Sequence, residues 1–276
     1  MQPQIEAIKK VIAKKVKGKV IAEHDEKGHH YRIGKGITSE LVDSVTTKLI
    51  LEKPHLVSWA VRMGFEWMEG KWASMDKTNR ESYLQGAILA HTEIRDQAGS
   101  IGSQAHDILE RWVNAWIETG ERPRDIKDFV LEGTNYRAIA SARSGEALFI
   151  KSGCIPIASE LLVGVKRYHS AGTLDMLVWN PTTEQLELWD WKTSNSVNDA
   201  YALQVSAYKK FFEVMTGLKI GVCKIIHLSK ESDHYGVYLI PNIDDAFKTF
   251  LAISKVYDWR ENGKKKLEKD IKVITF

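Results

Sequence analysis

The hydrophobic periodicity of the chain changes after Gly153, and this change limits the possible folds more than any other feature of the sequence. Upstream of Gly153, apolar residues recur mainly at the three- and four-residue spacing of helices. Downstream, three successive segments have strand character and are separated by turn residues. These predicted strands cover residues 155–165, 171–179 and 185–192.

The pattern after the third strand predicts how this sheet is completed. A helix is expected over residues 197–216, ended by Gly217. Two further strands at 220–228 and 235–240 follow, and then a helix over 243–262. The order β-β-β-α-β-β-α therefore predicts a mixed central sheet flanked by helices, in the α/β or α+β class.

The chain upstream of this core is expected to be largely helical. Residues 5–16 predict a helix with lysines opposite its apolar face, and residues 20–24 and 29–33 predict a hairpin. We therefore expect three parts packed as one compact unit, covering residues 1–35, 36–150 and 151–276. Helices of the middle part are expected at 54–68, 78–97, 103–119 and 135–150.

The composition excludes several classes of protein. With 43% hydrophobic and 27% charged residues, the chain is typical of a globular protein with a large core. No stretch of 18 apolar residues exists, so no membrane partner is expected. The net charge of +3 indicates no partner by itself. Lysines concentrated in residues 1–20 and a basic tail from Arg260 fit either nucleic-acid contact or a solvated surface.

The cysteine content and the N-terminus bear on the compartment. Two cysteines are too few for a disulfide framework and fit a reducing environment. The N-terminal segment lacks the apolar core of a secretory signal and the Arg and Ser enrichment of a transit peptide. We expect the cytoplasm of a bacterium or of a phage-infected host cell rather than the mitochondrial matrix.

Acidic side chains interrupt the apolar faces of three predicted strands. In strand 185–192, Asp190 and Lys192 share a face with two leucines, while two tryptophans lie on the other face. Asp175 lies on the preceding strand and Glu160 on the strand before that. Carboxylates that converge in this way repel one another unless a cation compensates their charge. Mg²⁺ is a natural candidate, because it prefers oxygen ligands. This combination suits phosphodiester hydrolysis.

Two other interpretations of these acids stay open from the residues alone. An Asp and a Lys separated by one residue also occur as a plain surface ion pair. A pair of carboxylates in a sheet is equally the machinery of a glycosidase, which needs no metal.

Four short motifs then occur in a recognisable order. They are Ile101-Gly-Ser-Gln-Ala-His106-Asp-Ile-Leu-Glu110, Tyr168-His-Ser-Ala-Gly-Thr-Leu-Asp175, Leu188-Trp-Asp-Trp-Lys-Thr-Ser194 and Gln204-Val-Ser-Ala-Tyr208. Together they resemble the RecB-like exonuclease branch of the PD-(D/E)XK nuclease superfamily, including mitochondrial genome maintenance exonucleases and phage relatives. The resemblance covers about residues 100–210. It implies a restriction-endonuclease-like fold and a Mg²⁺- or Mn²⁺-dependent DNA exonuclease that prefers single-stranded DNA.

The resemblance also implies individual roles. Asp175, Asp190 and Lys192 would be catalytic, with both aspartates binding the metal. Many superfamily members have Glu where Asp190 stands, and either carboxylate can bind Mg²⁺. His106, Glu160 and the main-chain carbonyl of Trp191 would complete the ligand set. Residues implied to hold DNA or to order the site are Gln204, Tyr208, Thr193 and Ser194.

Several of these assignments have plainer alternatives. A helical His106 also fits an ordinary polar or core residue, Glu160 a solvent-facing acid, and Tyr208 a core aromatic. Thr193 and Ser194 also fit a turn. For the whole chain, the alternatives are an endonuclease of the same fold acting on duplexes, flaps or junctions, and a non-catalytic DNA-binding recombination partner. The oligomeric state stays open.

Overall fold

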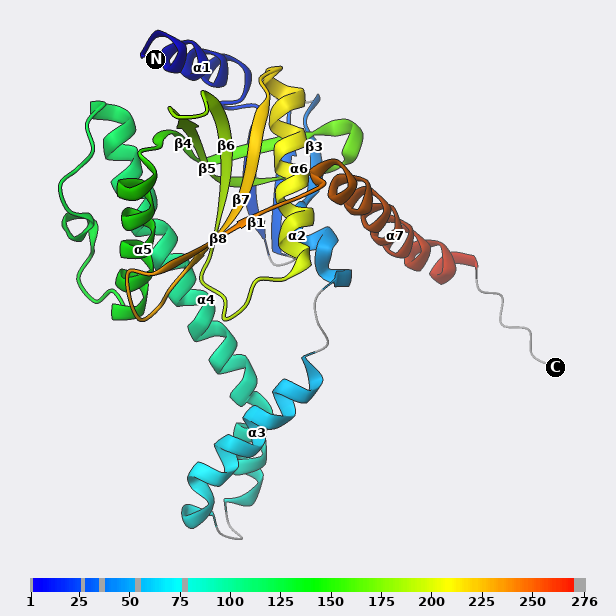
Figure 1. Cartoon of the computed structure of the whole chain (residues 1–276). Coiled ribbons are helices and arrows are strands. Elements are labelled where there is room, and N and C mark those ends of the chain that lie inside the picture. Colours follow the sequence, from blue (N-terminus) through cyan, green and yellow to red (C-terminus); the bar gives the residue numbers. More distant parts are fainter. Residues whose placement is uncertain (1, 26–27, 35–37, 53–55, 76–78, 271–276) are drawn as a thin grey trace.

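The computed structural model describes residues 2–25, 28–34, 38–52, 56–75 and 79–270. A mixed central sheet lies between helices, and much of the chain before residue 153 is helical (Figure 1). The predicted mixed α/β class is therefore confirmed.

The sheet has eight strands in the order β1-β2-β3-β5-β6-β7-β8, with β4 paired to β5 off this path. The pairs β3–β5 and β6–β7 are parallel, and all other pairs are antiparallel. The strands are β1 (Val20–Asp25), β2 (Gly28–Ile33), β3 (Glu40–Ser44), β4 (Ile155–Val165), β5 (Ser170–Asn180), β6 (Gln185–Lys192), β7 (Ile220–Leu228) and β8 (Tyr235–Leu239).

Strand β5 carries a fork that positions the site. One edge of β5 pairs with β4 along nearly its whole length. The other edge is shared, because β3 pairs only with Ser170 and Ala171 and β6 pairs only with residues 176–180. Residues 172–175 therefore face a gap between β3 and β6.

Helices cover the two faces of the sheet in separate groups. On one face, α4 (Arg80–Thr119) and α5 (Tyr136–Ser152) pack on Trp189 and Trp191. On the other face, α6 (Asp199–Thr216), α1 (Gln2–Lys15) and α7 (Ile243–Asp270) pack on Leu186 and Leu188. The side chains of β6 thus alternate as predicted, with the leucines in one hydrophobic core and the tryptophans in the other. The remaining helical segments are α2 (Val45–Lys48), η2 (Leu49–Glu52), α3 (Val57–Lys71), η3 (Trp72–Ser74), η4 (Ile126–Phe129) and η5 (Lys166–Tyr168).

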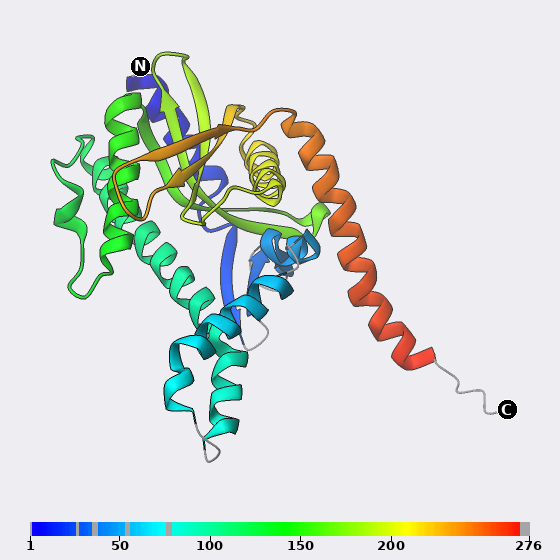
Figure 2. The same cartoon turned by 60° about the horizontal axis from the view of Figure 1, so that its bottom comes forward.

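Helix α4 corrects one expectation. Two helices were expected over residues 78–97 and 103–119, but α4 is one continuous helix of 40 residues. Gly99 and Gly102 lie within it, and a glycine inside a helix costs only about 1 kcal/mol relative to alanine. The N-terminal half of α4 packs antiparallel to α3, with Trp67 over Tyr83, and this helical pair projects away from the sheet (Figures 1 and 2).

The N-terminal part of the chain is more closely joined to the core than its sequence indicated. The predicted hairpin forms β1 and β2, and through β3 it extends the central sheet. Residues 40–44 are thus a strand inside the region expected to be helical. Among the described residues, no helix has an apolar stretch long enough to cross a membrane.

Gly172 makes the fork compact enough for α6 to approach it. A Cβ atom built on Gly172 would lie 2.4 Å from Cε1 of the buried Tyr208 ring. We expect Gly172→Ala to lower the free energy of unfolding by about 1–3 kcal/mol, because the ring must move in a packed core. Thermal and urea unfolding measure the effect.

The matched control is Gly99→Ala, on an exposed part of α4 where nothing lies within 4 Å of the added methyl group. This substitution should stabilise the protein by about 0.5–1 kcal/mol. Equal stability of the Gly172→Ala variant and the wild type would contradict the packing described for the fork.

Candidate metal centre

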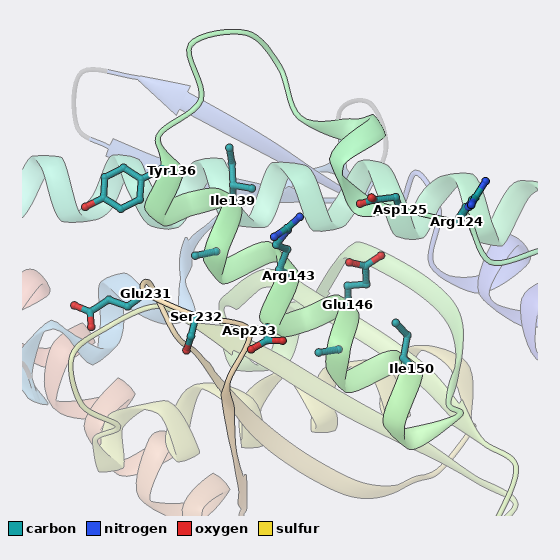
Figure 3. A pocket seen from close by; sticks show the side chains of 12 residues that line it. Arg124, Asp125, Tyr136, Ile139, Arg143, Glu146, Ile150, Glu231, Ser232 and Asp233 are labelled. Carbon is teal, nitrogen blue, oxygen red and sulfur yellow. The ribbon is translucent and has the colours of Figure 1, made fainter.

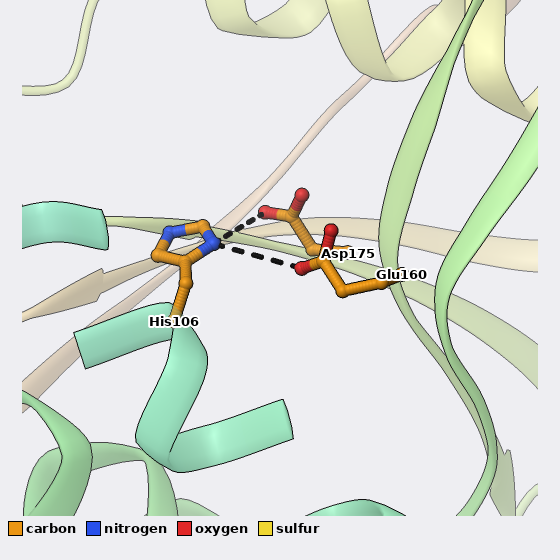
Figure 4. A group of neighbouring side chains, drawn as sticks. All are labelled: His106, Glu160 and Asp175. Carbon is orange, nitrogen blue, oxygen red and sulfur yellow. Dashed lines mark ion pairs between the residues drawn. The ribbon is translucent and has the colours of Figure 1, made fainter. Parts of the chain in front are cut away.

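Three side chains from three elements meet at the fork. His106 comes from α4, Glu160 from β4 and Asp175 from β5, and their ligand atoms all lie within 4.8 Å of one another (Figure 4). His106 Nδ1 is 3.8 Å from Glu160 Oε1 and 4.0 Å from Asp175 Oδ2. Oxygen ligands of Mg²⁺ stand about 3 Å apart when they are adjacent and about 4 Å apart when they are opposite. The three groups are therefore already near the separation that an ion requires.

The two acids of this group face each other across the β4–β5 ladder. Ser159 pairs with Met176 and Leu161 pairs with Leu174, so the register places Glu160 opposite Asp175. Glu160 has a φ of 45°, in the left-handed region that residues other than glycine rarely occupy. Such conformations persist where the surrounding structure enforces them, and they concentrate at functional sites.

Asp175 also joins the strand on its other side. The β5–β6 ladder ends at the pair Met176 and Trp189, so Asp175 and Asp190 are the next residues where the strands separate. The carboxylate of Asp175 accepts a hydrogen bond of 2.8 Å from the main-chain N–H of Trp191. This bond fixes one carboxylate oxygen at the point where the strands diverge. The proposed ligation by the Trp191 carbonyl stays a prediction.

Asp190 and Lys192 form the second part of the site. The Asp190 carboxylate is completely buried and forms an ion pair with Lys192 Nζ. Neither Asp190 oxygen has a hydrogen bond of ordinary geometry among the described residues. Lys192 Nζ also lies 4.9 Å from the ring centre of Tyr201 on α6. An incompletely paired buried carboxylate beside three other ligand groups fits a missing cation.

The pKa values of the two aspartates are raised, because the nearby cations do not fully offset the cost of burying their charges. Burial raises the pKa of Asp190 to about 6, although Lys192 acts in the opposite direction. Burial likewise raises the pKa of Asp175, more than His106 and Lys192 lower it. Each carboxylate therefore ionises less readily than it would in water, and a bound cation would favour the ionised form of both.

The two bases respond in the complementary way. Burial lowers the pKa of His106, but Asp175 and Glu160 raise it by more, so the net shift is upward. Burial also lowers the pKa of Lys192, and Asp190 with Asp175 again reverses the shift. Lys192 is therefore protonated at neutral pH, and its ammonium group is held against the acids.

Tyr208 and Gln204 support the site from α6. The Tyr208 ring packs against Gly172, and its hydroxyl accepts a 3.0 Å hydrogen bond from the Gln204 side chain. Burial raises the pKa of Tyr208 well above its ordinary value. Because Tyr208 is only 3% exposed, its position fits ordering of the site better than direct contact with DNA.

Thr193 and Ser194 lie just beyond Lys192, where the chain leaves the sheet. A Cβ atom on Gly102 of α4 would lie 2.9 Å from Thr193 Oγ1, so α4 passes very close to this turn. The Ser194 hydroxyl donates to the Ser196 carbonyl, and the His227 ring contacts the Ser194 carbonyl. Ser194 thus forms part of the turn, and both Thr193 and Ser194 border the open groove beside it.

The structure brings all the sequence-predicted groups to one end of the sheet, but it also includes residues that the motifs did not indicate. Tyr31 on β2 reaches Thr173 with a hydroxyl contact of 3.0 Å. No local pattern marks Tyr31, because its position depends on the β2–β3–β5 order. Gly172 lies inside the second motif, and its role could be anticipated because a glycine in a strand often marks a close approach of another segment. Trp112 is buried in the core, and Trp116 is half-buried against it.

A separate pocket of about 630 Å³ lies beside α5, and residues of this helix form part of its lining (Figure 3). Its lining mixes Arg124 and Arg143 with Asp125, Glu146 and Asp233, so charges of both signs compensate one another. None of the candidate metal-centre residues lines it. Pocket size alone therefore does not identify the reactive site.

The chain matches no model of a known protein family, and no curated protein matches it.

The raised pKa of Asp175 predicts an unusual effect on stability. A carboxyl group whose pKa is raised by folding destabilises the folded protein increasingly as pH rises from the unfolded value of about 4 to the raised folded value, and by a constant amount above it. Without metal at pH 7.5, Asp175→Asn should therefore raise the melting temperature by a few degrees, since about 2–4 °C corresponds to 1 kcal/mol for a chain of this size. The amide oxygen can still accept the hydrogen bond from Trp191. Scanning calorimetry between pH 4 and 8 measures the difference, which should shrink towards pH 4.

Glu213→Gln is the matched control with the opposite sign. Burial raises the pKa of Glu213, but hydrogen bonds led by Lys209 lower it by more, to below its ordinary value. Its ionised form therefore stabilises the fold above the unfolded pKa, and the substitution should lower the melting temperature at pH 7.5. If both substitutions lowered the melting temperature at pH 7.5, the ionised Asp175 side chain would not be destabilising the folded protein.

Proposed function

We propose that this chain is a metal-dependent DNA exonuclease of the PD-(D/E)XK type, acting preferentially on single-stranded DNA. The observation that carries this proposal is the junction of the His106–Glu160–Asp175 group with the buried Asp190–Lys192 pair at one gap in the sheet. The four motifs supply the expectation of a nuclease, and the geometry supports it independently of their order. The preference for single strands rests on the resemblance alone.

Mg²⁺ or Mn²⁺ would be held by Asp175 together with His106 and Glu160, and the orphaned oxygens of Asp190 offer a further ligand group. The mixed nitrogen and oxygen donors suit Mn²⁺ as well as Mg²⁺. When bound, such an ion lowers the pKa of a water and polarises a phosphate oxygen.

Lys192 acts as a cation in this proposal. Because its pKa is raised, the side chain stays protonated and can orient a water or offset negative charge that develops on the phosphate. Asp190 positions the ammonium group, and the Tyr201 ring limits its movement from the α6 side. Tyr208 and Gln204 act as positioning residues that keep α6 against Gly172.

A first experiment separates the proposed exonuclease from its alternatives. With Mg²⁺ or Mn²⁺, the protein should degrade end-labelled linear single-stranded DNA and leave circular single-stranded DNA intact, and a chelator should abolish degradation. Gel electrophoresis of linear, circular and duplex substrates measures this. Cutting of the circle would favour the endonuclease. No cleavage of any substrate would favour the non-catalytic DNA-binding protein.

Substitutions at the second part of the site test the residue roles. Asp190→Asn should abolish cleavage, and Lys192→Ala should lower kcat by about 10²–10⁴-fold, a range typical for loss of one catalytic group. Titration calorimetry of the Lys192→Ala variant should still detect Mn²⁺ binding, since Lys192 is not a ligand.

Lys209→Ala is the matched control for Lys192→Ala. Lys209 is equally buried, with 16% side-chain exposure against 15%, and is likewise ion-paired, but its partner is Glu213 away from the metal centre. Its cleavage rate should stay within about twofold of the wild type. Full activity of Asp190→Asn, or lost metal binding in Lys192→Ala, would refute the assigned roles.

A further inference from the structure

A groove of about 520 Å³ begins where β6 leaves the candidate metal centre. One wall is the face of α4 that carries Ile94, Gln97 and Ile101, and Thr193 lies beside it. Thr193 directly follows Lys192 in the chain, and Ile101 lies little more than one helical turn before His106 on α4, so the groove lies beside the proposed reaction site. Its volume is in the range of small-ligand pockets, which suits one strand rather than a duplex.

The opposite side of the groove carries two cations. Arg137 comes from the first turn of α5, and Lys230 comes from the segment between β7 and β8. Among the described residues, neither forms an ion pair with a carboxylate within 4.0 Å. The Arg137 guanidinium instead donates to the Tyr136 hydroxyl at 3.2 Å. Glu231 also lines the groove but is paired with neither cation.

These two positive charges are close enough to disfavour each other. Burial lowers the pKa of Lys230, and the Arg137 guanidinium lowers it further. Two like charges that form no ion pair repel each other across the groove. An anion bound between them would offset this repulsion and accept hydrogen bonds from both. The pocket of Figure 3 differs in this respect, because its two arginines lie among several acids.

The remaining lining suits a nucleotide strand rather than an isolated ion. The exposed Ile94 offers apolar surface for a sugar or a base face, while Gln97, Thr193 and Asn195 offer polar groups. Contact of His227 with the Ser194 carbonyl holds the turn that borders this surface. The groove thus combines a cationic side, an apolar wall and a connection to the reaction site.

We propose that this groove holds the backbone of a single DNA strand next to the scissile phosphate, with Arg137 and Lys230 contacting a neighbouring phosphate. This inference rests on the proposed nuclease function and assigns it a substrate-binding subsite. Arg137 and Lys230 bind the strand and take no part in bond cleavage.

The experiment compares two double variants that each remove two positive charges. Arg137→Gln/Lys230→Gln changes the groove, and Arg124→Gln/Arg143→Gln changes the pocket of Figure 3. Binding of a fluorescently labelled oligothymidylate is measured in chelator at several salt concentrations, and cleavage is measured with Mn²⁺. The groove variant should bind about tenfold more weakly, and its slope of log affinity against log salt should fall by about 0.7 for each lost cation–phosphate contact.

Three further readouts make the inference falsifiable. For the groove variant, KM should rise while kcat stays within about twofold of the wild type, since the reacting groups are untouched. Arg137→Lys/Lys230→Arg should restore binding, and melting temperatures check that every variant folds. The pocket variant should bind almost as tightly as the wild type.

The outcomes for the groove and for the nuclease are distinct. If wild-type protein cleaves DNA and both double variants bind it equally well, the groove inference is overturned and the nuclease stands. If binding depends on Arg137 and Lys230 but no substrate is cleaved, the groove is supported and the proposed enzyme is overturned. If the wild type neither binds nor cleaves DNA, both are overturned.

Discussion

Negative charge buried at a gap in the sheet is the constraint to which the surrounding structure responds. Glu160, Asp175 and Asp190 lie where the strand pairing is interrupted or ends, with both aspartates buried and Glu160 half-buried. His106 and Lys192 lie against them, and burial still raises the pKa of Asp175 and of Asp190 above the ordinary value. A binding site for a divalent cation requires this imbalance, because an exactly neutralised cluster would gain little from the ion.

The gap exists because β5 changes partners along one edge. β3 pairs with its beginning and β6 with its end, so the intervening residues have room for side chains instead of a ladder. Gly172 admits the Tyr208 ring from α6, and Gly102 lets α4 pass beside Thr193. Helices on both faces therefore reach the same break in the sheet. This arrangement allows His106 from one layer to meet carboxylates that the strands supply.

Much of this could be predicted from the sequence because the relevant signals are local. Alternation along residues 185–192 placed Asp190 and Lys192 on one face and the tryptophans on the other, and the two hydrophobic cores confirm that division. The continuity of α4 was missed because glycines suggest a break that packing can override. Tyr31, Arg137 and Lys230 were missed for another reason: their positions depend on strand order and on contacts between distant segments.

Glu160 connects stability to the proposed activity. Its left-handed backbone conformation costs of order 1–3 kcal/mol, and its carboxylate lies opposite that of Asp175. A site selected only for stability would relieve both costs with a glycine or a neutral side chain. Retaining them is consistent with a ligand that compensates the charge, since binding to the folded state alone stabilises that state. The same residues that lower the stability of the fold would then give it the largest gain in stability when the cation binds. This coupling would account for the concentration of backbone strain and acidic side chains at one break in the sheet.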